Sequence, residues 1–406
     1  MLIKPNMVLD AHELGTEYSI DCLITHPSLI RVIADYVIIA LKGTGKIIIA
    51  DAPLQSCDFN RLCEVAGYNN ILKFYKKYTF VPFELIDLRK IESKINNDLF
   101  IQVYECSGDP RGYSEVDFTN YSCHKEKRNL YKKFRVTNYN IFNMRKYHNA
   151  KKNSYLISNT VLKSDVIINI PKPKTHRKAG ITAALKNFIG IIGHKECLPH
   201  HTKGSIKEGG DEYLNKDWRQ RWAVNFQEIR NYISINNYIL LFPIFKYFAS
   251  FFWRLAYKKN INQFSEGSWY GNDTIWRKTL DLNRIVLYSD KHGKICHEKQ
   301  RRYLAIGDMI ISGDKEGPLM PSPKPIGVIL ASDDPVEFDY AVSLIMGFDY
   351  KKIPTIYNAL EENVLRLTNI KNANFNIKSN VDINLLNHKF RPTLGWQGHI
   401  EMEDVR

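Results

Sequence analysis

Short runs of aliphatic and β-branched residues recur along the chain, and each run is followed by polar residues and then by a loop or a helical pattern. Apolar runs that alternate with helical segments are typical of the parallel strands of an α/β fold. We therefore predict a mainly parallel sheet flanked by helices. The runs assigned to strands are 2–3, 46–50, 166–170, 303–306 and 326–330.

The polar residues that follow these predicted strands indicate where a ligand binds. In a parallel sheet the carboxyl ends of the strands lie at one edge, and ligands usually bind at that edge. Lys4 and Asn6 follow the first strand, Asp51 follows the second, and Asp308 follows the strand at 303–306. We expect Lys, His and Asp side chains from distant parts of the sequence to meet there.

Helical periodicity is clearest in the segment between the first two strands, from Pro27 to Leu41. Asp334 and Pro335 are typical of a helix cap and the first helical residue. The apolar face predicted for the first of these helices consists of Leu29, Val32, Ile33, Tyr36 and Val37.

These elements predict a single α/β domain at 1–350, followed by a C-terminal tail at 351–406 that packs on the core. The tail has a helical pattern from Tyr357 to Leu367 and then becomes irregular and rich in Asn. The chain shows no internal repeat of fixed period, which excludes a simple solenoid.

An aromatic-rich helical insertion at about 231–260 interrupts the α/β pattern, and its most apolar part is 238–257. Pro243, Lys246 and Arg254 within this part argue against a membrane-spanning helix. Polar residues recur every four positions from Lys246 to Lys258, so the helix has one narrow polar stripe. Three interpretations stay open: burial against the protein or a second subunit, an anchor on the membrane surface, or a lid.

The chain carries 57 Lys and Arg against 43 Asp and Glu, and the resulting charge of +14 favours an anionic partner, substrate or surface. The basic stretch 124–152 contributes +9 of this, from ten basic residues and one acid. Its interleaved aromatic residues are compatible with stacking on nucleic-acid bases. A solvated basic face is the simpler interpretation, so nucleic acid is not an expected partner.

Seven scattered cysteines form no C-x-x-C pair, so neither an iron–sulfur cluster nor a zinc ribbon is expected. The N-terminal residues lack the pattern of a signal peptide. We expect a cytoplasmic protein with reduced thiols, and association with a membrane surface is the alternative that the insertion suggests.

The densest group of chemically active residues lies between Pro171 and Gly190, in PKPKTHRKAGITAALKNFIG. Two prolines stiffen the exit from a strand and place Lys172 and Lys174 on alternate positions, with His176 just beyond. This arrangement predicts a binding loop for an anion.

The helix predicted after this loop strengthens that site. Thr182 is expected to cap the helix, whose N-terminal dipole attracts anions. Lys186 and Asn187 lie about one turn into the helix. The segment therefore predicts a site for a carboxylate or a phosphate, which Lys4, Asn6 and Asp51 of the neighbouring strands complete.

For catalysis, His176 or Lys186 is the expected proton-transfer group. If Lys174 or Lys186 is desolvated beside other cations, its lowered pKa suits a general base or a Schiff-base nucleophile. The segment from Gly307 to Pro323 is expected to be an acidic loop. In that loop Asp308 and Glu316 are candidates for a second acid/base pair or for Mg²⁺ ligands.

A metal site is the competing prediction. Four histidines, His176, His194, His200 and His201, fall within 26 residues, but the H-E-x-x-H spacing is absent. A divalent metal is therefore left open, and a metal-dependent isomerase or hydrolase is one alternative function.

Several motifs together resemble the bacterial and archaeal domain of unknown function 362 family over most of the chain. They are LIKPN at Leu2 to Asn6, DAP at Asp51 to Pro53, the long motif from Ile168 to Gly190, GDKEGPLMP at Gly313 to Pro321 and GVILASDDPVEFD at Gly327 to Asp339. The stretch from Gly267 to Ile285 is similar to a longer subgroup without an iron–sulfur module. The resemblance implies an α/β protein whose characteristic motif includes Lys174, His176, Lys186 and Asn187, and it implies no particular reaction.

The leading hypothesis is an enzyme that acts on a small carboxylated or phosphorylated metabolite, with Lys172, Lys174 and Asn187 binding the anion. The alternative from another class is a non-catalytic protein that binds a membrane surface or an anionic polymer. The sequence leaves the substrate, the metal and the oligomeric state open.

Overall fold

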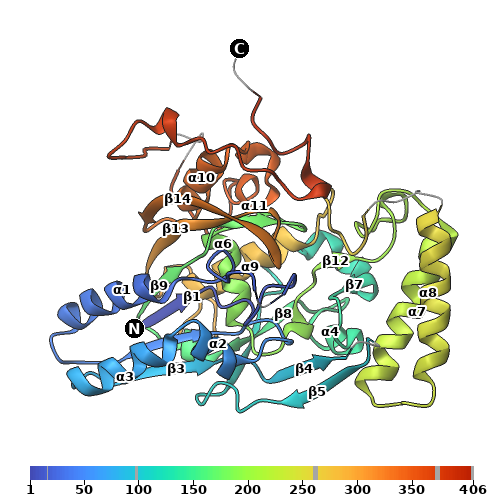
Figure 1. Cartoon of the computed structure of the whole chain (residues 1–406), viewed down its shortest axis with the longest axis horizontal. Coiled ribbons are helices and arrows are strands. Elements are labelled where there is room, and N and C mark those ends of the chain that lie inside the picture. Colours follow the sequence, from blue (N-terminus) through green and yellow to red (C-terminus); the bar gives the residue numbers. More distant parts are fainter. Residues whose placement is uncertain (16, 97–98, 259–263, 371–374, 404–406) are drawn as a thin grey trace.

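The structure is a computed structural model, and it describes all residues except 16, 97–98, 259–263, 371–374 and 404–406. An eight-stranded sheet lies at the centre, in the order β11-β10-β13-β9-β1-β2-β3, with β14 attached to β13 (Figure 1). Most neighbouring strands are parallel, as predicted. The strands are β1 (Leu2–Pro5), β2 (Ile47–Asp51), β3 (Phe83–Asp87), β9 (Val166–Ile170), β10 (Lys174–His176), β11 (Gly180–Thr182), β13 (Arg302–Glu316) and β14 (Met320–Ser332).

The last two predicted strands differ from the sequence-based expectation. β13 continues through Asp308 to Glu316 and pairs antiparallel with β14. The predicted loop at 307–323 is therefore mostly a long β-hairpin, and the prediction that 326–330 is a parallel strand was wrong. β14 pairs only with β13 in this sheet, and such an edge strand tolerates Pro321, Pro323 and Pro325 although proline lacks an N–H donor.

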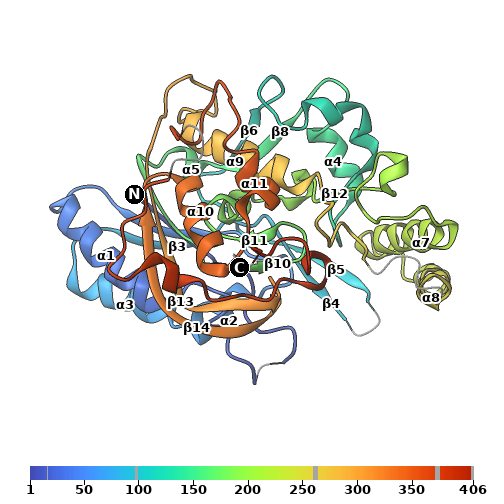
Figure 2. The same cartoon turned by 90° about the horizontal axis from the view of Figure 1, so that it is seen from above.

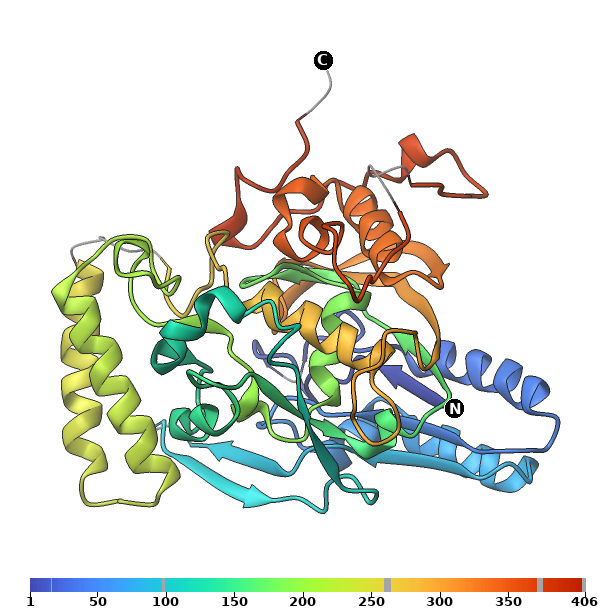
Figure 3. The ribbon, with the colours of Figure 1, turned by 180° about the vertical axis from the view of Figure 1, so that it is seen from behind.

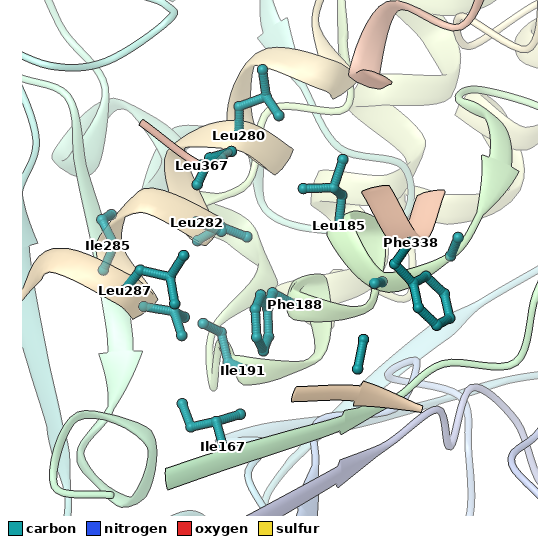
Figure 4. Packing of buried hydrophobic residues seen from close by; sticks show 14 of the residues in the cluster. Ile167, Leu185, Phe188, Ile191, Leu280, Leu282, Ile285, Leu287, Phe338 and Leu367 are labelled. Atoms are coloured by element: carbon teal, nitrogen blue, oxygen red, sulfur yellow. The ribbon is translucent and has the colours of Figure 1, made fainter. Parts of the chain in front are cut away.

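Helices cover both faces of the sheet because neighbouring strand residues point to opposite sides. Leu2 and Ile48 belong to the larger core cluster, whereas Ile3 and Ile49 belong to the second cluster on the other face. Figure 4 shows the larger core, where Leu185, Phe188 and Leu282 pack above the strand that carries Ile167. The larger cluster includes residues of α6 (Ala184–Asn187), α9 (Ile275–Tyr288), α10 (Pro335–Met346) and α11 (Pro354–Tyr357), and the second includes α1 (Pro27–Leu41), α2 (Phe59–Val65) and α3 (Tyr68–Tyr78).

Helix α1 has the predicted bounds, but its buried face is rotated from the predicted one. Leu29, Ile33 and Val37 are buried as expected. Val32 and Tyr36 are exposed, and the predicted burial of these two side chains was wrong. Their places are taken by Ile30 and Ala34. Both sets fit the helical period, so only the tertiary packing decides which of them is buried.

The C-terminal tail packs on the core, where Trp396 and Ile400 are buried. The helix predicted from Tyr357 to Leu367 was wrong, since α11 ends at Tyr357. The Asn358 side chain binds the Pro354 carbonyl, and α9 side chains bind the carbonyls of residues 365 and 366. The last two hydrogen bonds hold the segment after α11 against α9 in a non-helical conformation.

Smaller elements complete the part of the chain that the structure describes. They are the strand pairs β4 (Ile91–Ile95) with β5 (Ile101–Glu105), β6 (Tyr113–Asp117) with β8 (Ser154–Ser158), and β7 (Phe134–Arg135) with β12 (His201–Thr202), and the helices α4 (Ile141–Tyr147) and α5 (Asn159–Leu162). The 3₁₀ helices are η1 (Lys125–Lys133), η2 (Phe188–Ile191), η3 (Lys195–Cys197), η4 (Ile206–Glu208), η5 (Tyr350–Lys352), η6 (Ile383–Leu386) and η7 (Leu394–Trp396).

The predicted insertion forms a helical hairpin of α7 (Trp218–Ile235) and α8 (Phe242–Lys258). In Figures 1 and 2 the two helices lie side by side at one edge of the molecule, away from the central sheet, and Figure 3 shows the same arrangement from behind. No helix in the described residues has the length and apolarity required to cross a membrane.

The basic stretch 124–152 is partly neutralised by internal ion pairs. Lys127 lies 2.7 Å from Asp273, and Lys152 lies 2.5 Å from Glu115. Arg135 pairs with Glu228 of α7. Two of the aromatic residues in this stretch, Phe134 and Tyr139, are buried in a small core cluster instead of being available for stacking.

Candidate functional site

After β9 the motif between Pro171 and Gly190 forms the hairpin of β10 and β11, which is followed by α6. Pro171 and Pro173 interrupt the strand, and β10 resumes pairing on β13, with Lys174 beside Gly313. Lys174 and His176 lie on alternate positions of β10 and therefore point to the same side. Thr182 is directly opposite Lys174 on β11.

These side chains line a cavity of about 180 Å³, which we call the lysine cavity. Its walls come from β10, the turn after it, α6, η3 and the loops that follow β1 and β2. Asp51 is the only acidic residue among the described lining residues. The polar residues that line it are Asn6, Asp51, Thr137, Tyr139, Lys174, His176, Arg177, Lys178, Thr182, Lys186, Asn187, Lys195 and His200.

Lys186 has the least compensated charge of the four cavity lysines. Its side chain is partly buried, and no hydrogen bond or ion pair to its ammonium group is found among the residues described. Burial, together with the charges of Lys195 and Lys178, lowers the pKa of Lys186 to about 7. An amine with this pKa is present in both protonation states near neutral pH.

The other three cavity lysines are held by polar groups of the protein. Lys174 donates to the Asn6 Oδ1 atom at 2.8 Å and to the Leu23 carbonyl, and burial lowers its pKa to about 7. Lys195 donates to the carbonyls of residues 52 and 53, and Lys178 lies 3.8 Å from Glu266. Burial lowers the pKa of both Lys178 and Lys195 to about 8.

Two histidines face the lysine cavity with opposite hydrogen-bonding character. The Nδ1 atom of His176 accepts hydrogen bonds from the backbone N–H groups of Lys178 and Ala179, which leaves the proton on Nε2. The Nδ1 atom of His200 donates to the Leu198 carbonyl at 2.8 Å, so its Nε2 is an acceptor. Burial and nearby lysines hold the pKa of both rings well below the usual value, so both are neutral at pH 7.

A buried polar cluster supports the floor of the lysine cavity. Lys4 lies 2.9 Å from Asp51, which also accepts hydrogen bonds from the backbone N–H groups of Met7 and Ala52. Gly190 packs directly on this pair, and a Cβ atom there would lie 1.9 Å from the Asp51 carboxylate. Glycine is therefore required at this position by the close approach of the Asp51 side chain.

Asn187 and Asn6 link the strands below the site. The Asn187 amide donates to the Asn169 side chain at 2.7 Å and to the Lys4 carbonyl, and its oxygen accepts from Asn6. With these bonds formed, Asn187 orients Asn6 and through it Lys174. The geometry gives Asn187 a positioning role at the predicted anion site.

Thr182 does not cap a helix, and that prediction was wrong. The N-cap of α6 is Ala183, and the first N–H groups of the helix donate to the Asp339 carboxylate on α10. Burial raises the pKa of Asp339 to about 8. The Thr182 hydroxyl is buried without a hydrogen-bond partner, so it is available to a molecule in the lysine cavity.

Four predicted residues do not line the lysine cavity: Lys4, which is buried beside Asp51, and Lys172, Asp308 and Glu316. Lys172 and Asp308 form a fully buried ion pair at 2.6 Å. Asp308 also accepts from the His26 backbone at the start of α1. Glu316 is exposed at the end of β13 and accepts from the Leu394 backbone in the C-terminal tail.

The four clustered histidines are separated in the structure. His176 and His200 share the lysine cavity, His194 lies 3.1 Å from Glu196, and His201 lies 3.7 Å from Glu212 in a neighbouring pocket. Within the described ranges, no group of three or more His, Cys, Asp or Glu side chains is arranged to hold a metal ion.

Lys178, Lys195 and His200 were not among the predicted site residues. Nothing in the sequence separates Lys178 and Lys195 from ordinary charged residues, and His200 was considered only as a metal ligand. The turn at 177–180 and η3 bring them into the cavity. One feature of the sequence could have indicated a wider basic site: the stretch from Pro171 to Lys195 contains no acidic residue.

Comparison with known proteins agrees with the motifs at this site. No curated protein and no solved structure matches the chain significantly. The sequence model of one family matches residues 101–343, which is more than half of the chain and contains Lys174, His176, Lys186, Lys195 and His200. The chain therefore belongs to the family described as Domain of unknown function (DUF362).

Proposed function

We propose that the chain is an enzyme that binds a small carboxylated or phosphorylated molecule in the lysine cavity. The observation that supports this most strongly is the excess of buried positive charge. Four lysines line one cavity, and its only described acidic residue is already paired with Lys4. Buried cations are costly unless an opposite charge compensates them, and a bound anion supplies that charge.

The unused hydrogen-bonding groups fit the same kind of ligand. The Nε2–H group of His176, the Thr182 hydroxyl and the Lys186 ammonium group all face the cavity without a partner among the described side chains. All three donate hydrogen bonds, and carboxylate and phosphate oxygens accept them. In this proposal Lys174 adds charge to the anion site from its position between Asn6 and Leu23.

Proton transfer is assigned to Lys186, with His200 as a second acceptor. A general base works best when its pKa is close to the working pH, and burial lowers the pKa of Lys186 to about 7. His176 serves as a hydrogen-bond donor in this scheme because its Nδ1 atom is already occupied by two backbone N–H groups. The reaction class is therefore proton abstraction or protonation next to an anionic group.

A direct test is native mass spectrometry of the purified full-length chain. The proposal predicts a stoichiometric small anion that is retained by the wild type and lost in Lys186→Met. A wild-type protein that carries no anion and binds neither inorganic phosphate nor simple dicarboxylates at millimolar concentration would contradict the proposal.

The affinity for sulfate is expected to fall at least about tenfold between pH 6.5 and pH 9, as the cavity lysines with pKa of about 7 to 8 lose their protons. Sulfate is the appropriate probe because its own charge is constant over this range. Isothermal titration calorimetry at pH 8 in buffers of different ionisation enthalpy should also detect proton uptake on binding. A pH-independent affinity without proton uptake would exclude the lysines as the binding groups.

A further inference from the structure

The hairpin of α7 and α8 leaves a large apolar surface uncovered. Leu240 at its turn is 91% exposed, and Tyr247 on α8 is 65% exposed. We define the hairpin face as the exposed apolar residues of this element. They are Trp218, Trp222, Ile229, Tyr232, Tyr238, Ile239, Leu240, Leu241, Ile244, Tyr247, Phe248 and Phe251.

Helix α8 has two apolar sides, and only one of them is used inside the protein. Phe242, Ala249 and Ala256 lie seven residues apart, on one side of the helix, and are buried. Ile244, Tyr247, Phe248 and Phe251 occupy other positions around the helix and are exposed. A helix that is apolar on two sides normally has a second environment to cover the free side.

Aromatic contacts join the two helices into one continuous surface. Phe226 of α7 stacks on Phe248 and Phe252 of α8, with ring centroids 5.1 and 5.4 Å apart. Trp222 stacks on Phe226 and Phe252. The hairpin face is therefore held in a defined arrangement without an external partner.

We propose that the hairpin face docks on the surface of an anionic phospholipid bilayer. The hairpin at 218–258 contains six basic residues and one acid, Glu228, which is paired with Arg135 and Lys203. Arg219 and Arg221 are paired with Asp217 and Glu208, whereas Arg254 on α8 is exposed. Exposed Trp and Tyr side chains beside basic residues are characteristic of the polar–apolar boundary of a membrane. The hairpin therefore matches both the apolar layer and the negative charge of such a surface.

The charge and shape of the hairpin favour a bilayer over a second copy of the chain. Each copy carries +14, so the net charge of the chain opposes the association of two copies. Four consecutive apolar residues, 238–241, are exposed at the convex turn. Leu99 beside β5 is exposed too, and Phe100 contacts Phe242 at the same end of the hairpin. A convex apolar tip inserts into a deformable lipid interface more readily than it matches a flat protein surface.

The hairpin lies next to the lysine cavity. Residues 136, 137 and 139 line both the lysine cavity and a second pocket, whose other wall includes Val224 of α7 and Trp253 of α8. The hairpin is thus separated from the proposed site by a single segment of chain.

Flotation of the full-length chain with lipid vesicles tests this inference. The wild type is expected to float with vesicles of equal parts phosphatidylcholine and phosphatidylglycerol, and more weakly with phosphatidylcholine alone. The double variant Leu240→Ser and Tyr247→Ser should bind at least about tenfold more weakly, because two apolar side chains no longer enter the lipid. The control Phe80→Ser removes a fully exposed aromatic residue outside the hairpin and should float like the wild type.

The outcomes separate this inference from its rivals and from the proposed function. Wild-type protein that does not float, or a double variant that floats as well as the wild type, overturns it. So does light scattering that shows a wild-type dimer and a monomeric double variant, because a second copy then covers the face. Lys186→Met should float normally, so a failure at the lysine cavity leaves the vesicle result unaffected.

Discussion

Lys186→Met is expected to weaken anion binding about 10- to 100-fold while making the unliganded protein more stable at pH 6 by about 1 kcal/mol or more. The loss of affinity follows from the removal of the cavity cation that no protein group compensates. The gain in stability has a definite sign. The pKa of Lys186 in the folded protein, about 7, lies below the value of 10.5 for an unperturbed lysine, so the unfolded chain binds the proton more tightly.

The pH dependence of this effect is a sharper test than its size. The cost of the buried charge is fully present below pH 7 and disappears as the pH rises towards 10.5. Denaturant unfolding of the wild type and Lys186→Met should therefore differ most at pH 6 and converge at high pH. Lys207→Met replaces an exposed lysine and is the matched control. A Lys186→Met protein that is less stable than the wild type at pH 6 would contradict the assignment.

Asp308→Asn is expected to destabilise the fold by about 3 kcal/mol or more, because removal of one partner leaves the Lys172 charge buried. Both side chains are almost fully inaccessible, and their charged atoms lie 2.6 Å apart. The asparagine keeps the size of the aspartate, so the effect isolates the charge. Denaturant unfolding measures it, and Glu316→Gln at the exposed end of the same strand should change stability by less than about 0.5 kcal/mol.

A double variant distinguishes a structural role of Asp308 from a catalytic one. Asp308→Asn with Lys172→Met removes both charges and should recover part of the lost stability. Sulfate affinity at the lysine cavity should remain close to that of the wild type, since neither residue lines that cavity. Asp308→Asn with wild-type stability and no anion binding would instead support the acid/base role that the sequence suggested.

Local patterns predicted the parts of the fold that depend on neighbouring residues. The bounds of α1, the cap of α10 at Asp334 and the strands β1, β2 and β9 follow from periodicity and capping chemistry. The hairpin of β13 and β14 was missed because Gly and Pro usually mark loops. Only the pairing of the two strands shows that these prolines lie on an edge where no N–H group is required.

The residues of the candidate site also fall into two groups, those that local sequence patterns predict and those that only the fold brings together. Lys174, His176, Lys186 and Asn187 could be assigned to one motif from the amino-acid sequence, because they are close in the chain. The fold is what brings Lys195 and His200 into the same cavity and pairs Lys172 with Asp308. Burial and electrostatic pairing depend on distances in space, and these are set by strand order and not by sequence separation.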